Sequence, residues 1–185
     1  LPTDAESVGI WIRVNELNQG LLNQIPNIWA RVTDASGRYH SLSLGTLPYT
    51  QSGQDWTYLE AVLPLEYAGI ELPFSVVSIY MSGRYGGSLG GLQPGSFSLD
   101  DMTAKGPSAP LDGTVVEGFE DPTGPNTWIS IPNVDSSADR VKLSQKAARS
   151  GVLGLNFSWR DVLDNAPRGI LIPAGPLPLP AIGGP

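Results

Sequence analysis

The chain contains no cysteine and a single histidine, His40. A disulfide framework and a cysteine-based metal or redox site are therefore excluded, and a histidine-based zinc site or a Ser-His triad has little support. No block of Lys or Arg occurs and the net charge is −7, so we expect no nucleic-acid partner. No apolar run approaches the ~20 residues of a membrane-spanning helix, and no signal peptide is recognisable. Because the chain starts at Leu1 without an initiating Met, we expect it to be a segment of a longer protein.

Apolar and polar residues alternate at period two in several short segments of the 185-residue chain, which predicts strands with one buried face. In the first two such segments the aliphatic residues share one face, while Trp11, Arg13, Trp29 and Arg31 occupy the other. Turn residues, among them 22 Gly and 17 Pro, separate the segments. Strands are expected over residues 8–14, 28–32, 38–44, 56–63, 74–81, 97–104, 115–121, 128–131, 140–143, 152–159 and 169–173. This spacing predicts an all-β antiparallel sandwich.

A junction organises the chain. Residues 97–104 have the pattern of a strand that closes a β-sandwich, and residues 115–121 have the pattern of a strand that opens one. Between them, residues 105–113 are rich in Pro, Gly, Ser and Ala, the composition of a linker or turn. Only residues 145–150 and 160–165 have a composition that could turn helically, and both stretches are short.

Several motifs resemble the galactose-binding-like jelly roll, the fold of many carbohydrate-binding modules. GFED followed by a Trp, and then DRVKLSQKAARSGVLGLNFSW, are similar to its first strands, and GSFSLDDMTA is similar to its last. The resemblance covers most of residues 8–173. More loosely, the overall run and the exit GILIPAGPLPLPAI resemble the extracytoplasmic part of bacterial ABC transporter permeases of the FtsX/MacB-like type. This second resemblance implies an exported or membrane-anchored parent protein.

The order of these motifs predicts a circular permutation. The first half supplies what resembles the later strands of a jelly roll, and the second half supplies the first ones. Neither half could close a sandwich alone, because each would leave open sheet edges and an uncovered apolar face. We therefore expect a single permuted jelly-roll β-sandwich over residues 1–173, built from closing strands at 8–104, a linker at 105–113 and opening strands at 114–172, followed by a Pro/Gly-rich tail at 174–185. We expect the chain to be predominantly monomeric.

The pair Asp100-Asp101 falls where the apolar residues of its strand change from odd to even positions. Such a slip predicts a β-bulge, which commonly re-aims a side chain. In the jelly rolls that this chain resembles, an acidic residue of the last strand and one of the first often hold a structural Ca²⁺, an ion that prefers oxygen ligands. The matching positions are Asp101 and Glu120, with Asp121 as a further candidate. The alternative is a solvated acidic edge in an acidic protein.

Trp11, Arg13, Trp29 and Arg31 form a candidate ligand-binding patch. If their two strands are neighbours, the four side chains make an aromatic and cationic surface that could stack on sugar rings or dock a protein. The alternative is that loops cover the tryptophans and the arginine stems pack over them.

Candidate catalytic residues are few. His40 shares the face of Leu42 and so is expected to be a core or edge histidine. Asp55, Glu60 and Glu66 could in principle pair for glycoside hydrolysis, yet nothing in the sequence places two of them across a cleft. We therefore expect a non-catalytic extracytoplasmic module that is structural or binds a protein partner in a transporter-like assembly. A carbohydrate-binding module is the alternative, and a glycoside hydrolase is a remote one.

Overall fold

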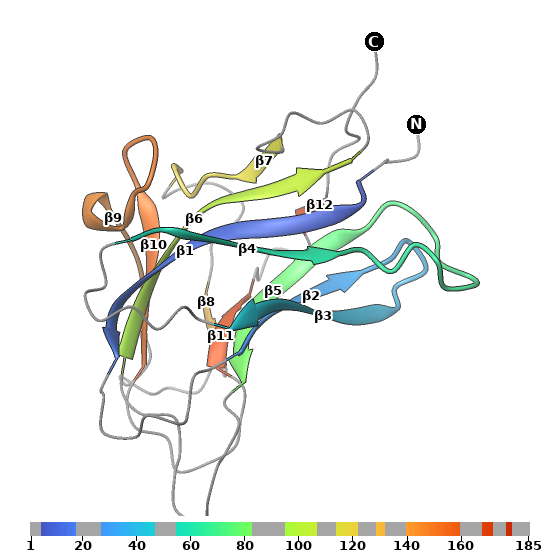
Figure 1. Cartoon of the computed structure of the whole chain (residues 1–185), viewed down its shortest axis with the longest axis horizontal. Helices are drawn as coiled ribbons and strands as arrows, with labels where there is room; N and C mark the ends of the chain where they lie inside the picture. The colour runs from blue at the N-terminus through green and yellow to red at the C-terminus, as the bar shows by residue number, and fades with distance from the viewer. Residues whose placement is uncertain are drawn as a thin grey trace, which may run out of the picture.

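The structure, a computed structural model, describes residues 5–17, 27–46, 55–82, 95–106, 114–121, 129–131, 140–159, 168–171 and 177–178. Within these ranges the chain forms two antiparallel sheets packed face to face, which confirms the expected all-β sandwich (Figure 1). The helical turn expected near residue 145 is the short 3-10 helix η1 (Gln145–Ala147). None of the described helical segments is long and apolar enough to cross a bilayer.

The first sheet, sheet A, has the strand order β4-β1-β6-β10-β9, and β7 also pairs with β6. Its strands are β1 (Ser7–Leu17), β4 (Thr57–Val62), β6 (Gly95–Lys105), β7 (Thr114–Glu117), β9 (Arg140–Ser144) and β10 (Gly154–Trp159).

The second sheet, sheet B, has the order β3-β2-β5-β11-β8, and β12 also pairs with β5. Its strands are β2 (Asn27–Thr33), β3 (Tyr39–Thr46), β5 (Ser75–Ser82), β8 (Ile129–Ile131), β11 (Arg168–Leu171) and β12 (Leu177–Pro178). β4 and β3 therefore end their sheets on the same side of the sandwich, as Figure 1 shows.

The core lies between the sheets and is filled by the alternating faces that the sequence predicts. Ile10 and Ile12 of β1 and Val32 of β2 are fully buried, and Phe157 of β10 packs against Phe97 of β6 with 5.2 Å between ring centroids. Because side chains alternate across a strand, the intervening residues of β1 and β2 point away from this core. The outer faces of the two sheets consequently lie on opposite sides of the molecule.

Strand β6 is buried on both faces, from Gly95 to Ala104. One edge of β6 pairs with β1 along its length, and the other edge changes partner, from β10 at residues 95–99 to β7 at residues 102–104. The change falls at Asp101, which has a φ of 42° and interrupts the register with β1. The predicted bulge is confirmed, and its position is where β6 passes from one neighbour to the next.

Strands from both halves of the chain share these sheets, since β7 and β10 pair with β6, and β11 pairs with β5. Circular permutation of a jelly roll stays a prediction. Leu177–Pro178 pairs with β5, a contact that the prediction of a tail did not include. The rest of the predicted tail, most of the predicted linker and the helical candidate at 160–165 lie outside the described residues.

Candidate functional site

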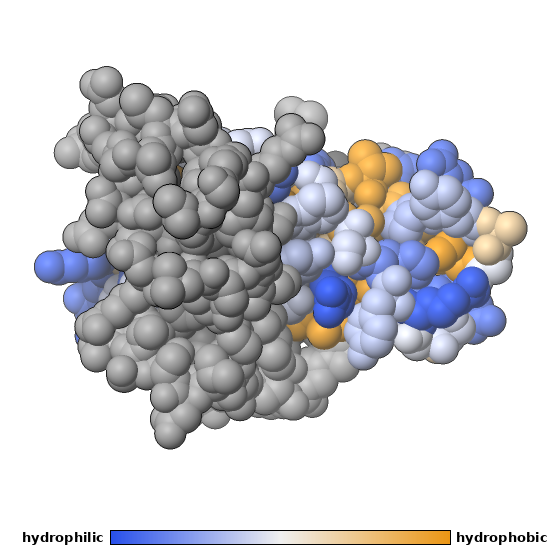
Figure 2. All heavy atoms as spheres, turned by 90° about the horizontal axis from the view of Figure 1, so that it is seen from below, coloured by the Kyte–Doolittle hydropathy of each residue, from blue (hydrophilic) through white to orange (hydrophobic). Residues whose placement is uncertain are grey.

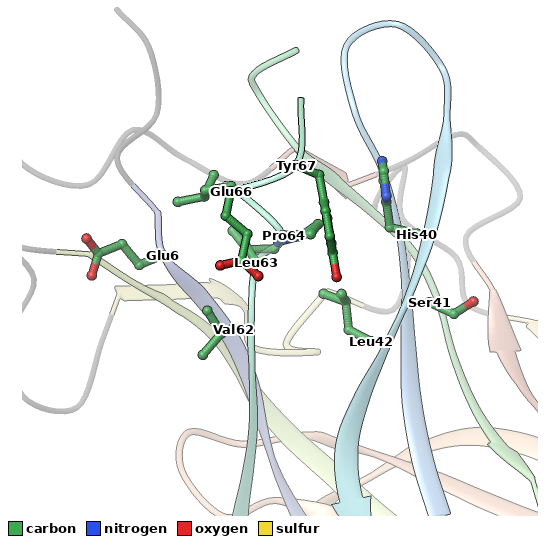
Figure 3. A pocket seen from close by; sticks show the side chains of 10 residues that line it. Glu6, His40, Ser41, Leu42, Val62, Leu63, Pro64, Glu66 and Tyr67 are labelled. Atoms are coloured by element: carbon green, nitrogen blue, oxygen red, sulfur yellow. The ribbon is translucent and has the colours of Figure 1, made fainter. Parts of the chain in front are cut away.

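A cleft of about 560 Å³ opens between the edge strands β3 and β4 (Figure 3). This volume lies in the range of small-molecule and side-chain binding sites. The cleft is lined by Glu6, His40, Ser41, Leu42, Val62, Leu63, Pro64, Leu65, Glu66 and Tyr67. Half of these lining residues are aliphatic or proline, and two glutamates are the charged groups among them.

The cleft exists because the chain leaves β4 in a turn rather than continuing the strand. The Leu63 N–H donates to the carbonyl of Glu6, and the Tyr67 N–H donates to the carbonyl of Pro64 at 3.3 Å, so the turn folds back beside β3. At the other end of the two strands, a Cβ built on Gly45 would lie 3.6 Å from Leu59, so β3 and β4 approach each other there. The two sheet edges thus meet at one end and separate at the other.

Side chains reach into this opening from the turn. In Figure 3 the Glu66 carboxylate points toward Leu63, and the Tyr67 ring runs down between Glu66 and His40 with its hydroxyl near Leu42. The Glu6 carboxylate points away from the centre of the cleft. Tyr67 is 63% exposed. The cleft therefore presents an accessible aromatic ring beside a carboxylate, above an aliphatic floor.

Next to the cleft, the buried carboxylate of Asp34 organises the β2–β3 turn. Its Oδ1 accepts hydrogen bonds from the Ser36 hydroxyl at 2.5 Å and the Arg38 N–H at 3.0 Å, and its Oδ2 lies 3.3 Å from His40 Nε2. These contacts, the Ser36 hydrogen bond foremost, outweigh the opposing effect of burial and lower the pKa of Asp34 from 3.8 to about 2. His40 in turn packs edge-on against Phe74, with 5.7 Å between ring centroids.

This arrangement positions His40 structurally. The Ser36 hydroxyl donates to Asp34 and not to His40, so these three residues do not form a nucleophile–base–acid relay. Of the three carboxylates considered for glycoside hydrolysis, Glu66 lines the cleft, while Asp55 and Glu60 do not. Glu60 accepts hydrogen bonds from Ser7 and from Lys105 instead.

The structure does not bring the four residues of the expected aromatic patch together. β1 belongs to sheet A and β2 to sheet B, so Trp11 and Arg13 lie on one outer face of the sandwich and Trp29 and Arg31 on the opposite one. The premise that their strands are neighbours is wrong. Local alternation reports which face of a strand is buried, but not which sheet holds the strand.

On sheet A, arginines cover the tryptophans. The Arg149 guanidinium lies 3.8 Å from the centre of the Trp11 ring, and Arg13 lies 4.9 Å from the centre of the Trp56 ring. Arg13 also donates to the carbonyl of Lys146, which ties the segment after β9 to this face. This face matches the alternative in which loops and arginine stems pack over the aromatic rings.

On sheet B, Trp29 and Tyr80 are cross-strand neighbours with nearly parallel rings, 14° apart in orientation and 6.4 Å between centroids. Arg31 is exposed and lies 5.5 Å from the centre of the Tyr80 ring. Two nearly parallel rings with a cation beside them are groups of the kind that stack on sugar rings.

The acidic residues of the bulge hold the loop that enters β10. Oδ2 of Asp100 accepts the N–H groups of Arg149 and Ser150 at 2.5 and 3.0 Å, and Asp101 pairs with the Arg149 guanidinium at 2.8 Å. Glu120 accepts the N–H groups of Val152 and Leu153. Although Asp100 receives three N–H donors, burial is the largest influence on it and raises its pKa.

These contacts bear on the predicted calcium site. Asp101 and Glu120 both bind the loop at 149–153, but their oxygens accept from N–H and O–H donors and, at Asp101, from a guanidinium. That set of partners suits a hydrogen-bonded carboxylate, and an ion bound to Asp101 would have to displace Arg149. Within the described ranges, no three His, Asp or Glu residues gather as a metal site would require. Calcium binding stays a prediction.

Of the seven large apolar or aromatic side chains that are exposed on the described surface, three line the cleft. Val62 and Leu65 line it together with Tyr67, and Figure 2 shows apolar patches interleaved with polar residues over this part of the molecule. The sequence singles out His40 and Glu66 separately but does not predict that both line one cleft. A local signal for the cleft is the group of apolar residues in the turn after β4, whose exposure is not visible in the sequence.

Comparison of the chain with models of protein families, with curated proteins and with solved structures gives no match.

Proposed function

We propose that the chain is a non-catalytic β-sandwich module that works outside the cytoplasm and binds a protein partner at the cleft between β3 and β4. The observation that carries the proposal is the cleft itself, whose apolar rim includes Val62, Leu65 and Tyr67 in exposed positions. Exposed apolar residues grouped around a depression are typical of interaction sites. The extracytoplasmic setting and a place in a membrane transporter-like protein rest on the sequence resemblance alone.

Selection of a random peptide library on the immobilised chain tests this proposal. We expect selected peptides to lose at least about tenfold in affinity on Tyr67→Ala or Val62→Glu, because both side chains form the rim. Val115→Glu is the matched control, since Val115 is also exposed but lies on β7, away from the cleft. Peptides that bind all four proteins equally would place the interaction elsewhere.

Carbohydrate binding is the second candidate, and the Trp29–Tyr80 pair with Arg31 favours it. A glycan array provides the test: saturable binding that is lost on Trp29→Ala but kept on Trp11→Ala would assign a sugar site to sheet B. Binding that depends on Trp11 instead would assign the site to sheet A.

A further inference from the structure

The charged residues that line the cleft are both acidic. Glu6 and Glu66 are its charged lining residues, and neither carboxylate makes a hydrogen bond or ion pair with any described residue. The nearest arginine of the adjacent turn, Arg38, is held by Asp34 and Ser36. The cleft consequently offers uncompensated negative charge to a ligand.

The carboxylate of Glu66 lies beside an aromatic ring. Figure 3 shows Tyr67 next to Glu66, and the ring is largely exposed. A carboxylate together with an aromatic face binds the ammonium of lysine or the guanidinium of arginine through charge and through the ring quadrupole. One end of the cleft therefore suits a cation.

The floor of the cleft suits an aliphatic group. Leu63 is almost fully buried, and Leu42 is half-buried against the core, so Leu42 presents the accessible apolar surface at the base. An aliphatic side chain placed there would cover the surface that Leu42 still exposes, which is favourable in proportion to the area covered.

Strand β3 supplies a third element of recognition. It ends its sheet in the described part of the chain, so half of its N–H and C=O groups point away from β2. A sheet edge of this kind pairs with an extended peptide, and pockets beside it select alternate side chains. His40 and Leu42 are two residues apart in β3, so their side chains point to the same face of the strand, and both line the cleft.

We infer that the cleft binds an extended segment of the partner protein in which a lysine or arginine alternates with aliphatic residues. The cation contacts Glu66 and Tyr67, and an aliphatic neighbour contacts Leu42 and Leu63. This inference rests on the proposed function and specifies the chemistry of the partner at the same site.

The test uses three short acetylated peptides: lysines alternating with leucines, the same peptide with glutamates in place of lysines, and the same with serines in place of leucines. We expect the lysine–leucine peptide to shift the methyl NMR signals of Leu42 and Leu63 and to bind at least about tenfold more tightly than either counterpart. Glu66→Gln should weaken it about two- to fivefold, the size expected for an exposed ion pair, and Glu66→Lys should weaken it further.

Glu71→Lys is the control, because Glu71 is exposed and nearby but does not line the cleft. Equal binding of the lysine and glutamate peptides, or equal effects of Glu66→Lys and Glu71→Lys, would overturn the inference while leaving a peptide-binding cleft in place. Absence of methyl shifts with any of these peptides, and with peptides selected from the library, would overturn the proposed function as well. Self-association that is lost on Glu66→Lys would assign the cleft to a second copy of the chain and overturn the inference.

Discussion

Two buried aspartates illustrate how neighbouring donors decide the behaviour of a carboxyl group. Asp34 receives a short hydrogen bond from Ser36 and lies beside His40, and its pKa falls to about 2. Asp100 receives backbone N–H donors, but its desolvation is larger and its pKa rises. The two groups are therefore expected to respond to pH in opposite directions.

The substitution Asp34→Asn should reveal the effect of the lowered pKa of Asp34 on stability. The folded pKa of Asp34 lies below its unfolded value of 3.8, so its stabilising effect is complete above about pH 5 and is lost between about pH 4 and pH 2. The difference in melting temperature between the wild-type chain and Asp34→Asn should be constant near neutral pH and shrink as the pH falls through this window. Asp100→Asn serves as the comparison, because the wild-type chain should gain relative to it on acidification; equal slopes for the two variants would contradict the assigned directions.

Calcium binding by the carboxylates of Asp101 and Glu120 is a further prediction about individual residues. If an ion binds only the folded chain, excess Ca²⁺ raises the melting temperature relative to an EDTA control by mass action. The effect should disappear in Glu120→Gln. Identical melting curves with Ca²⁺ and with EDTA would mean that hydrogen bonds alone hold the loop.

Among the elements, the segment that runs from η1 through the loop to the first residue of β10 passes very close to its neighbours. A Cβ added at Gly154 would overlap the backbone carbonyl of Ala147, and one added at Gly151, which has a φ of 62°, would overlap the Glu120 carboxylate. The loop packs over the outer face of sheet A, where Ala147 is buried. Small residues are thus needed where this loop passes close to itself and to Glu120.

Gly154→Ala should therefore destabilise the chain by about 1–3 kcal/mol, because the loop must shift to admit the methyl group. Urea unfolding followed by tryptophan fluorescence measures the change. Gly118→Ala is the matched control, since a Cβ there meets only ordinary contacts, at 3.7 Å from Glu120 and 3.9 Å from Val115. A similar loss of stability for both variants would show that the close approach at Gly154 is not the cause.

The sequence predicts a strand wherever one face of that strand is buried and the other is exposed. β1 and β2 were predicted from alternation, and the bulge at Asp100-Asp101 was predicted from the change of phase, because both signals are local. The carboxylate contacts of Asp100 with Arg149 join residues 49 apart, and nothing local encodes them. The cleft depends on how the edges of two sheets separate, and sheet membership is set by long-range pairing that the alternation does not report.

At the scale of the molecule, the two halves of the chain complete each other's sheets. Without residues 114–185, β6 would lose β7 and β10, and β5 would lose β11. We expect fragments 1–106 and 114–185 to be unfolded when separate and to recover the native spectrum when mixed. A cooperative unfolding transition in either fragment alone would contradict this interdependence.

The joined chain should be a monomer. A short connection between the halves gives a high effective concentration for pairing within one chain and disfavours exchange between chains. Light scattering should give a mass near 19.6 kDa. A concentration-dependent dimer would indicate that the halves exchange between chains or that the cleft binds a second copy; Glu66→Lys distinguishes the two, because it affects only the cleft.

Burial of β6 on both faces also predicts that backbone amides in different strands exchange hydrogen with solvent at different rates. Residues 95–99 and 102–104 of β6 have a strand on each side and no exposed face, so we expect their amide hydrogens to exchange with deuterium only in large openings of the sandwich. β3 ends its sheet and has exposed residues along its outer face, so its amides exchange through small local openings. The cleft thus lies beside a strand that we expect to open more often than β6, and a bound peptide strand would be detected as slowed exchange along β3.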